Sequence, residues 1–313
     1  MSPRWRIGAP RGVALINALL LVAALSAITV TLMQRAELAR ARLGGMLDAD
    51  QLGLYLDAAE QLAFGLLAQP SGTAGITHLD QVWAQPFVEE PIDRGTVSLR
   101  ISDLQGRFNL AWLSRPALDE SDLEERAIIF EAFGQLMQDL GLDQQVRRRL
   151  IQALDPELGQ RVTAWGRSTR PPDLPLVSVF QLRLVEGVSD ADLEVLAPHV
   201  TSLPTQTMPN MNTISPEVLA AFLPRANAGS LAAALTQARP FEDSTAALDW
   251  IESRFGADAR TRISALDPDV HSDWFELRIA ARLDRLRLTR NVVLHRDDPS
   301  VCCKIVLALP EPD

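Results

Sequence analysis

An uncharged, largely apolar run from Val13 to Met33 lies close to the N-terminus and constrains the fold more than any other feature. As a helix it is about 30 Å long, which is enough to cross a lipid bilayer. Three arginines precede it, Arg4, Arg6 and Arg11, and basic residues in this position favour a cytoplasmic N-terminus. We therefore expect a single-pass anchor that places the rest of the chain across the membrane.

The position of a small residue relative to the run separates two kinds of leader. An ordinary secretory signal has its small-residue cleavage site after the apolar stretch, whereas Gly12 comes before it. Cleavage between Gly12 and Val13 would remove residues 1–12 and leave the apolar helix in place. In this respect RGVALINALLLVAALSAITVTL resembles the leaders of type IV prepilins and type II secretion pseudopilins, which implies processing by a prepilin peptidase. The alternative is a signal anchor that is never cut.

Composition limits the classes of function that fit the chain. The net charge is −10, and the leader contains three arginines and no acid, so a processed chain is more acidic still. Such a protein should not bind nucleic acid, nor anionic lipid beyond its anchor. With 313 residues, 47% of them hydrophobic, the chain can bury a sizeable core. The only cysteines, Cys302 and Cys303, are adjacent and bridge poorly, so we expect them on opposite faces of a strand and no disulfide framework.

The helix is predicted to continue far beyond the membrane. Residues 34–68 are rich in strong helix formers, and Pro70 provides a stop. We predict one long helix over residues 13–68, with the transmembrane segment at 13–33, whose second half packs on a globular domain. The alternative is a linker followed by a separate surface helix. An apolar stripe at helical spacing is assigned as the face that contacts partner helices, and it consists of Leu52, Tyr55, Ala59, Leu62 and Leu66.

Strand patterns occur in two blocks that are far apart in the chain. Residues 96–102 alternate as a half-buried strand does, and Gly106 marks a turn after them. Three further strands are predicted near the C-terminus, at Trp274–Leu283, Leu286–His295 and Val301–Leu309. We therefore predict an α+β fold, with the long helix packed on a small antiparallel sheet from residues 69–115 and 266–313. An all-helical domain, residues 116–265, is inserted between the strands.

Helix start signals support the helical insertion. Ser121 and Glu124 have the spacing of a capping box, and Ser189 precedes another apolar run. Ser215 followed by Pro216 combines an N-cap residue with proline at the first helical position.

Two segments of the insertion narrow the resemblance. PNMNTISPEVLAAFLP, which contains Asn212 and Thr213, and ARPFEDSTAALDWIE resemble the signature region of the minor pseudopilin K family of type II secretion. GRFNLAWL and SDWFELRIAARLDRLRLTRNVVLHR resemble that family's segments on either side of its inserted helical domain. The resemblance implies an inner-membrane protein with a periplasmic domain that initiates or caps the pseudopilus and supports export of folded proteins across the outer membrane. Its partners would be the I-type and J-type minor pseudopilins and the major pseudopilin. The alternative is a minor pilin of a type IV pilus.

Asn17 is the fifth residue if Val13 is the first of the processed chain, and most pilins and pseudopilins carry glutamate there. A carboxylate inside a membrane needs a positive partner, which the resemblance assigns to the N-terminus of the subunit ahead. The K subunit lacks the glutamate, so the resemblance implies that Asn17 marks a tip subunit. Alternatively, Asn17 helps helices to associate by hydrogen bonding.

The paired short helices of the insertion also resemble helix-hairpin-helix elements, which bind DNA phosphates. Phosphate binding requires flanking positive charge, yet residues 205–265 contain six acids and five arginines, and no tight glycine hairpin follows Leu223. A protein-binding or scaffolding role is therefore favoured.

Neither an enzyme nor a metal centre is indicated. The histidines are isolated in the sequence and form no HExxH motif or paired-ligand spacing: His78, His199, His271 and His295. Calcium is the one metal that the resemblance brings into consideration, through a loop with Asp155, Glu157 and Asp173. Calcium takes six to eight oxygen ligands, and this loop is less acidic than the family's, so we assign no calcium site.

Overall fold

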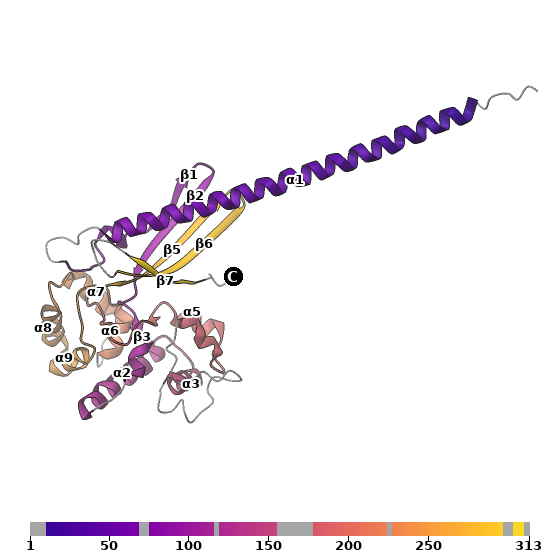
Figure 1. The fold of residues 1–313 in the computed structure, drawn as a ribbon. Helices are drawn as coiled ribbons and strands as arrows, with labels where there is room; N and C mark the ends of the chain where they lie inside the picture. Colours follow the sequence, from indigo (N-terminus) through magenta and orange to yellow (C-terminus); the bar gives the residue numbers. More distant parts are fainter. Residues whose placement is uncertain are drawn as a thin grey trace, which may run out of the picture.

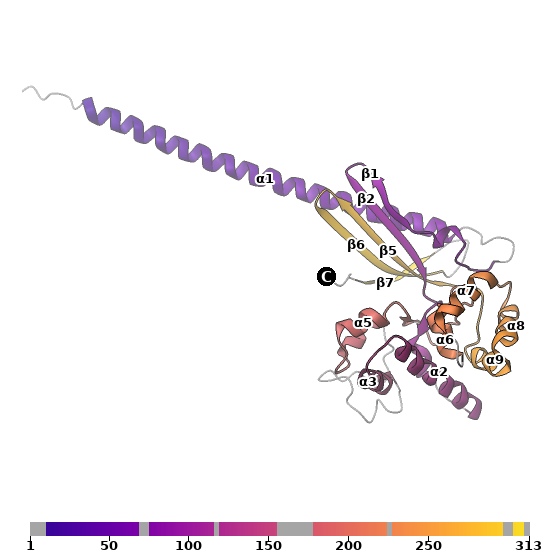
Figure 2. The same ribbon diagram turned by 180° about the vertical axis from the view of Figure 1, so that it is seen from behind.

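The computed structural model describes residues 11–68, 75–115, 119–154, 178–223, 227–296 and 303–309. It consists of a long helix, a five-stranded sheet beside the C-terminal half of that helix, and a group of short helices (Figure 1). Seen from either side, the short helices lie at the end of the molecule opposite the free end of the long helix (Figures 1 and 2).

The long helix, α1, is continuous over Arg11–Leu67, which confirms the prediction of a single helix rather than a linker and a separate one. Its first half projects away from the rest of the described chain (Figure 1). Its second half is buried against the sheet through residues spaced three or four apart, which form one face. These buried residues are Leu52, Leu56, Ala59, Ala63 and Leu67.

The sheet is antiparallel throughout, in the order β1-β2-β5-β6-β7. Its strands are β1 Phe87–Ile92, β2 Gly95–Asp103, β5 Trp274–Leu283, β6 Leu286–His295 and β7 Lys304–Leu309. The predicted limits of β5 and β6 are confirmed to the residue, and β2 extends the prediction by one residue at each end. β7 begins later than the predicted Val301, which lies outside the described residues. β1 was not predicted.

Short helices make up most of the described residues between β2 and β5. The α-helices are α2 Glu120–Asp139, α3 Gln144–Leu154, α5 Asp190–Leu196, α6 Pro216–Phe222, α7 Ala228–Ala238, α8 Ser244–Phe255 and α9 Ala257–Ser264. Among the described residues of this stretch are two 3-10 helices, η2 Leu110–Ser114 and η3 Val179–Leu184, and a further one, η1 Val82–Ala84, lies before β1. A separate parallel pair joins β3, Phe108–Asn109, to β4, Val200–Thr201. GRFNLAWL therefore forms a very short strand followed by a 3-10 turn.

The helix caps explain where several helices start. Ser189 forms a capping box with Asp192, and the Ser215 hydroxyl accepts from the amide of Val218 at 3.2 Å, so both predicted starts are confirmed. The predicted cap at Ser121 is wrong. α2 begins earlier, and the Asp119 carboxylate accepts from the amide of Asp122 at 3.0 Å. Aspartate caps a helix as well as serine does, so the first available cap residue starts the helix.

Two hydrophobic cores are found in the described part of the chain. One is formed by α1, η1 and the inner face of the sheet. The other lies among the short helices around Phe108, whose ring is 5.3 Å from that of Trp112 and 5.2 Å from that of Phe133 between centroids. Leu110 and Val270 belong to this second core although both lie outside residues 116–265. The segments that enter and leave the predicted insertion therefore contribute to its core.

Candidate assembly surface and buried polar junction

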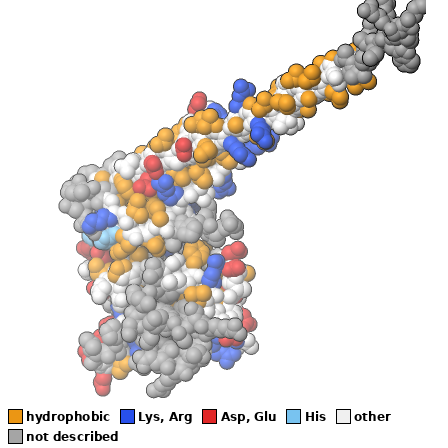
Figure 3. All heavy atoms as spheres, turned by 45° about the vertical axis from the view of Figure 1, so that its right-hand side comes forward, with side chains coloured by type: hydrophobic (Ala, Val, Ile, Leu, Met, Phe, Trp, Pro, Cys, Tyr) orange, Lys and Arg blue, Asp and Glu red, His pale blue; other side chains and the backbone are white. Residues whose placement is uncertain are grey.

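The first half of α1 is an exposed apolar surface. From Leu15 to Met33 its side chains have no burial within the chain. Hydrophobic side chains cover this half of the helix, and basic side chains appear where the apolar run ends (Figure 3). It belongs to the one helix in the described chain that is long and apolar enough to span a membrane. So large an apolar surface requires lipid or neighbouring helices to cover it, which fits a membrane anchor.

The polar residues of this half differ in how they are satisfied. Thr29 donates to the carbonyl of Leu25 at 2.8 Å and Thr31 to that of Ala27 at 2.7 Å, so both hydroxyls bond within the helix. The side chain of Asn17 is exposed and makes no hydrogen bond to the described part of the chain. Its role as a tip marker stays a prediction. Gly12 and Val13 lie in the first turn of α1, and cleavage between them also stays a prediction.

The stripe assigned from the sequence as a partner face is mostly in contact with the chain's own sheet. Leu52 and Ala59 are buried there, and the half-buried Tyr55 and Leu66 pack against the same core. Only Leu62 is exposed, at 47%. The assignment is therefore wrong for Leu52 and Ala59, because the inner face of the sheet is apolar and must itself be covered.

A second stripe, which we call the outward stripe, lies on the other side of α1. Its members are separated by four, seven and eight residues, so they share one face of the helix, away from the buried one. All four are leucines whose side chains are about half exposed or more: Leu43, Leu47, Leu54 and Leu62. Exposed apolar residues at this spacing are typical of a surface that packs against another helix.

Ion pairs hold the second half of α1 to the sheet. Arg290 of β6 donates to the carboxylates of Asp57 at 2.7 Å and Glu60 at 3.1 Å, and its hydrogen bond to Asp57 is the main reason why the pKa of Arg290 is raised. Near the strand turns, Arg94 bonds to Asp48 at 3.0 Å and to Asp284. The orientation of the helix on the sheet is therefore fixed by charge as well as by packing.

A buried carboxylate lies where the sheet meets the short helices. Asp103, the last residue of β2, accepts through Oδ2 from the hydroxyls of Ser272 and Thr213, each at 2.5 Å. Its Oδ1 accepts from the amide of Gln105 at 2.8 Å. Burial raises the pKa of Asp103, and these hydrogen bonds act against that rise. One side chain thus joins segments that are more than one hundred residues apart.

Asn210 and Asn212 connect this junction to the rest of the helical part. The Asn210 amide donates to the Ser272 hydroxyl at 2.7 Å and to the carbonyl of Thr77 at 3.0 Å. Asn212 donates to the carbonyl of Phe241 at 3.0 Å and accepts from its amide at 2.7 Å. The two segments that carry the family resemblance are therefore bonded to one another, and the side chains of both asparagines are buried.

Two further side chains close the junction. Gln105 accepts through Oε1 from the amide of Asp273 at 2.7 Å, at the entry to β5. Arg296, after β6, donates to the carbonyl of Ser272 at 2.5 Å and to the hydroxyl of Thr77 at 3.2 Å. Buried polar groups that are bonded in this way specify one arrangement of the surrounding segments. The junction therefore fixes the short helices to the end of the sheet.

Gly106 is required at this junction. A Cβ atom there would lie 2.5 Å from the carbonyl oxygen of Thr213, which is backbone and has no room to move aside. The Gly106 carbonyl itself accepts from the amide of Ser215 at 2.9 Å. Close backbone approach, rather than the predicted turn alone, therefore explains this glycine.

The remaining predicted residues do not form a site. Within the described ranges no three histidine, cysteine, aspartate or glutamate side chains are grouped to hold a metal ion. Asp155, Glu157 and Asp173, considered for calcium, lie outside the described residues. Cys303 packs against the core of the sheet, and Cys302 is not among the described residues.

A family model, curated relatives and a solved structure all match this chain to type II secretion system protein K. The family model for type II secretion system protein K matches residues 106–205. Type II secretion system protein K of Aeromonas hydrophila is 29% identical over 321 residues, which cover 93% of this chain and 95% of that protein. The protein of the same name from Pseudomonas aeruginosa is 30% identical over 230 residues, 67% of each chain. A crystal structure of the GspK-GspI-GspJ complex from enterotoxigenic Escherichia coli matches with a TM-score of 0.69 and 22% identity, over 87% of this chain and all of the matched one.

Proposed function

Because the chain belongs to the family of type II secretion system protein K, a minor pseudopilin, we propose that it is the tip subunit that initiates or caps the periplasmic pseudopilus. In this role it supports the export of folded proteins across the outer membrane and has no catalysis of its own. Membership of this family does not favour the alternative of a minor pilin in a type IV pilus.

One observation carries the proposal: the two ends of the molecule differ in what they are able to contact. At one end the free half of α1 is apolar and unpartnered in the described chain, as a subunit that assembles through its helix requires. At the other end the short helices form a broad group beyond the sheet (Figure 1). A second copy stacked above the first would meet this group, which supports a single copy at the tip.

We extend the proposal to the orientation and the processing of the chain. The arginines before Gly12 support a cytoplasmic N-terminus in the inner membrane and a periplasmic sheet and helical part. A prepilin peptidase would cut between Gly12 and Val13. Gly12→Leu should leave a full-length precursor, which N-terminal sequencing of the extracted protein detects. A mature chain that still starts at Met1 in the wild type contradicts this part of the proposal.

The partners that we propose are the I-type and J-type minor pseudopilins, with the major pseudopilin below them. The structurally similar complex contains proteins named GspK, GspI and GspJ, which supports this choice. The outward stripe is the surface that we assign to these contacts, because its leucines are exposed and lie along the helix that pilin-like subunits share.

Co-purification of the full-length chain with the I-type and J-type subunits in detergent tests the assignment. Leu54→Glu places a charge at the centre of the outward stripe and should reduce recovery of the complex about tenfold or more, as loss of a buried apolar contact does. Leu123→Glu is the matched control, because Leu123 is also an exposed leucine, at 54% against 68% for Leu54, and lies on α2. Equal recovery of the complex with both variants contradicts the assignment of the outward stripe as the contact surface. A long homopolymer of this chain contradicts the tip position.

A further inference from the structure

The face of the sheet that points away from α1 carries an unusual set of charges. Side chains alternate between the two faces of a strand, and the residues of β2, β5 and β6 on this outer face include Arg100, Arg278, Arg282 and Arg287. All four are exposed. The strand register places Arg100 directly opposite Arg278, and Arg282 directly opposite Arg287. Like charges in this relation destabilise a sheet, so the stability of the fold does not account for them.

On the inner face of the same strands, by contrast, an arginine is neutralised by carboxylates of the chain itself. Arg290, on the inner face of β6, has two carboxylates from α1 within 3.1 Å. On the outer face of β2, β5 and β6 the one acid is Glu276, which already pairs with Arg107 at 2.6 Å and Arg278 at 3.1 Å. In the part of the chain that the structure describes, Arg100, Arg282 and Arg287 have no ion-pair partner. This is notable in a chain whose net charge is −10.

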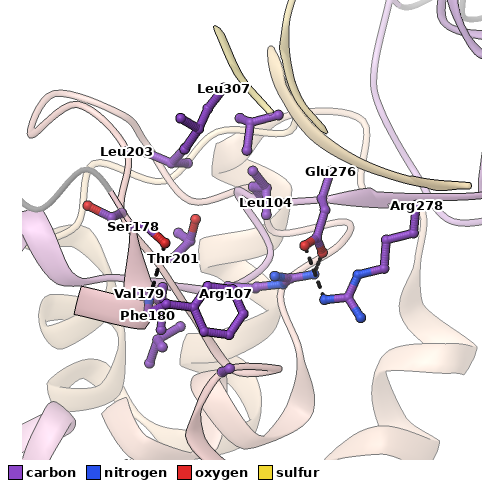
Figure 4. Close-up of a pocket in the computed structure, with 14 residues that line it drawn as sticks. Leu104, Arg107, Ser178, Val179, Phe180, Thr201, Leu203, Glu276, Arg278 and Leu307 are labelled. Carbon is purple, nitrogen blue, oxygen red and sulfur yellow. Dashed lines mark hydrogen bonds and ion pairs between the residues drawn. The ribbon is translucent and has the colours of Figure 1, made fainter. Parts of the chain in front are cut away.

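The outer face is also hollowed on both sides of Arg278. A hollow of about 420 Å³ lies toward β1, where Phe87, Val88 and Arg100 line it. A narrower pocket lies toward the short helices and is drawn in Figure 4. There Arg107, Glu276 and Arg278 form a charged group on one side, while Leu104, Leu203 and Leu307 supply apolar walls. The outer face therefore presents basic and apolar side chains next to one another.

We propose that this outer face binds an acidic polypeptide segment of a partner protein. Carboxylates of the segment pair with Arg100 and Arg278 at one position and with Arg282 and Arg287 at the next, about 13 Å further along β5. Guanidinium groups bind carboxylates through two parallel hydrogen bonds, which gives such pairs both strength and direction. Apolar side chains between the carboxylates enter the two hollows.

The apolar walls select a polypeptide over a nucleic acid. A nucleic acid would present phosphates at every nucleotide and would use aromatic stacking platforms. Of the two aromatic residues that line the hollows, Phe87 packs against the core beneath α1 and Phe180 is half-buried, so neither is an open stacking platform. The acidic chain as a whole also repels a polyanion. A polypeptide supplies carboxylate and apolar groups in alternation, as this face requires.

This site goes beyond the proposed function, because helix packing through the outward stripe does not use it. The outer face of the sheet and the outward stripe of α1 face opposite directions, with the core between them. Failure of one interaction therefore leaves the other intact.

Binding of a fluorescein-labelled peptide of alternating glutamate and valine to the full-length chain in a non-ionic detergent tests the proposal by fluorescence anisotropy. The double variant R282Q/R287Q removes two charges that no described residue pairs. The control R148Q/R254Q removes the same charge from exposed positions on α3 and α8. We expect about tenfold weaker binding for the first variant and no change for the second. Added salt should weaken the wild-type complex.

Three results would overturn the proposal. The first is equal affinity of the two double variants, which shows that the outer face is not used. The second is equal binding of a glutamine–valine peptide, which shows that charge is not recognised. The third is tighter binding of a single-stranded oligonucleotide than of the acidic peptide, which assigns the arginines to phosphate. Thermal melts of each variant, monitored by circular dichroism, confirm that the comparison is made between folded proteins.

Discussion

The two halves of α1 belong to one continuous helix and yet have opposite surroundings. From Leu15 to Met33 every side chain is exposed, whereas from Leu52 to Leu67 one face is completely buried by the sheet. Both halves are rich in leucine and alanine, so composition does not separate them. The difference is that one half has a partner within the chain and the other has none. An apolar helix half that finds no internal partner must be covered from outside, by lipid or by other subunits.

The largest effect should come from the half that the sheet covers. Leu56 is 4% exposed and belongs to the core beneath α1, so Leu56→Ala should lower the free energy of unfolding by about 2–5 kcal/mol. Leu54 lies two residues away and is 68% exposed, so Leu54→Ala should change the free energy of unfolding by about 0.5 kcal/mol or less. Urea unfolding in detergent measures both. Equal effects would break the comparison between the faces of the helix.

The free half should respond to charge rather than to lost volume. Leu21→Arg places a cation near the middle of the predicted span, which costs about 2.5–3.5 kcal/mol on insertion scales. Leu38→Arg makes the same change beyond the span and should be tolerated. Extraction of membranes at alkaline pH distinguishes integrated from released protein. If Leu21→Arg integrated as well as Leu38→Arg, the first half of α1 would not be the anchor.

The sheet that covers the second half should weaken in acid. Burial alone would raise the pKa of Glu276, but the charges of Arg107 and Arg278 outweigh it, so its pKa lies below the ordinary 4.5. A carboxylate whose pKa is lowered by folding stabilises the fold at pH values above its unfolded-state pKa. This stability is lost as the pH falls through its folded-state pKa. Protonation of Glu276 should cost about 1–3 kcal/mol once the pH falls below its folded-state pKa. Measuring the free energy of unfolding as a function of pH checks this, because Glu276→Gln should remove the part of the acid destabilisation that Glu276 causes.

Acid should also distinguish the halves of α1 by hydrogen exchange. If the second half depends on the sheet, its amides should lose protection as Glu276 becomes protonated, while those of the first half in a micelle should not. Simultaneous loss in both halves would mean that the helix responds as one unit. Asp103 contributes with the opposite sign, because a raised folded pKa gives stability that is lost as pH rises.

The smallest effect should come from the ion pairs along the second half. Arg290→Gln removes the contacts to Asp57 and Glu60, which are partly exposed, and should cost about 1 kcal/mol or less. Arg287→Gln is the matched change on the outer face of the same strand. Arg287 pairs with no described acid and lies opposite Arg282, so its loss should leave the stability of the fold unchanged or raise it slightly. Thermal unfolding of the two variants side by side measures the difference.

Local patterns in the sequence predicted the elements that local physics determines. β5 and β6 alternate over ten residues each, and Ser189 and Ser215 cap their helices as expected. β1 escaped prediction because FVEEPI does not alternate and contains a proline, which is tolerated on an edge strand. The overall α+β architecture followed from the order of the strand and helix blocks.

The functional surfaces were harder to predict because they depend on contacts between distant residues. The stripe through Leu52 and Ala59 was recognised as apolar, but only the position of the sheet shows that it is already covered. The junction around Asp103 joins residues near positions 77, 210 and 272, and no local pattern links them. The arginines of the outer face become a group only through the strand register.

The pairing of β2 with β5 has a consequence for the order in which the chain folds. These strands are neighbours in the sheet, but the short helices with their own core lie between them in sequence. Until β5 has been synthesised and has crossed the membrane, β1 and β2 form an isolated hairpin, which is marginally stable in water. The contacts within the helical part span less of the sequence than the pairing of β2 with β5, so closing the sheet requires a longer loop to be ordered and is slower. For that interval the second half of α1 has no sheet to pack on, and its buried face resembles the free half. The young subunit then exposes an apolar face on both halves of its helix and is most in need of a chaperone or of a neighbouring subunit.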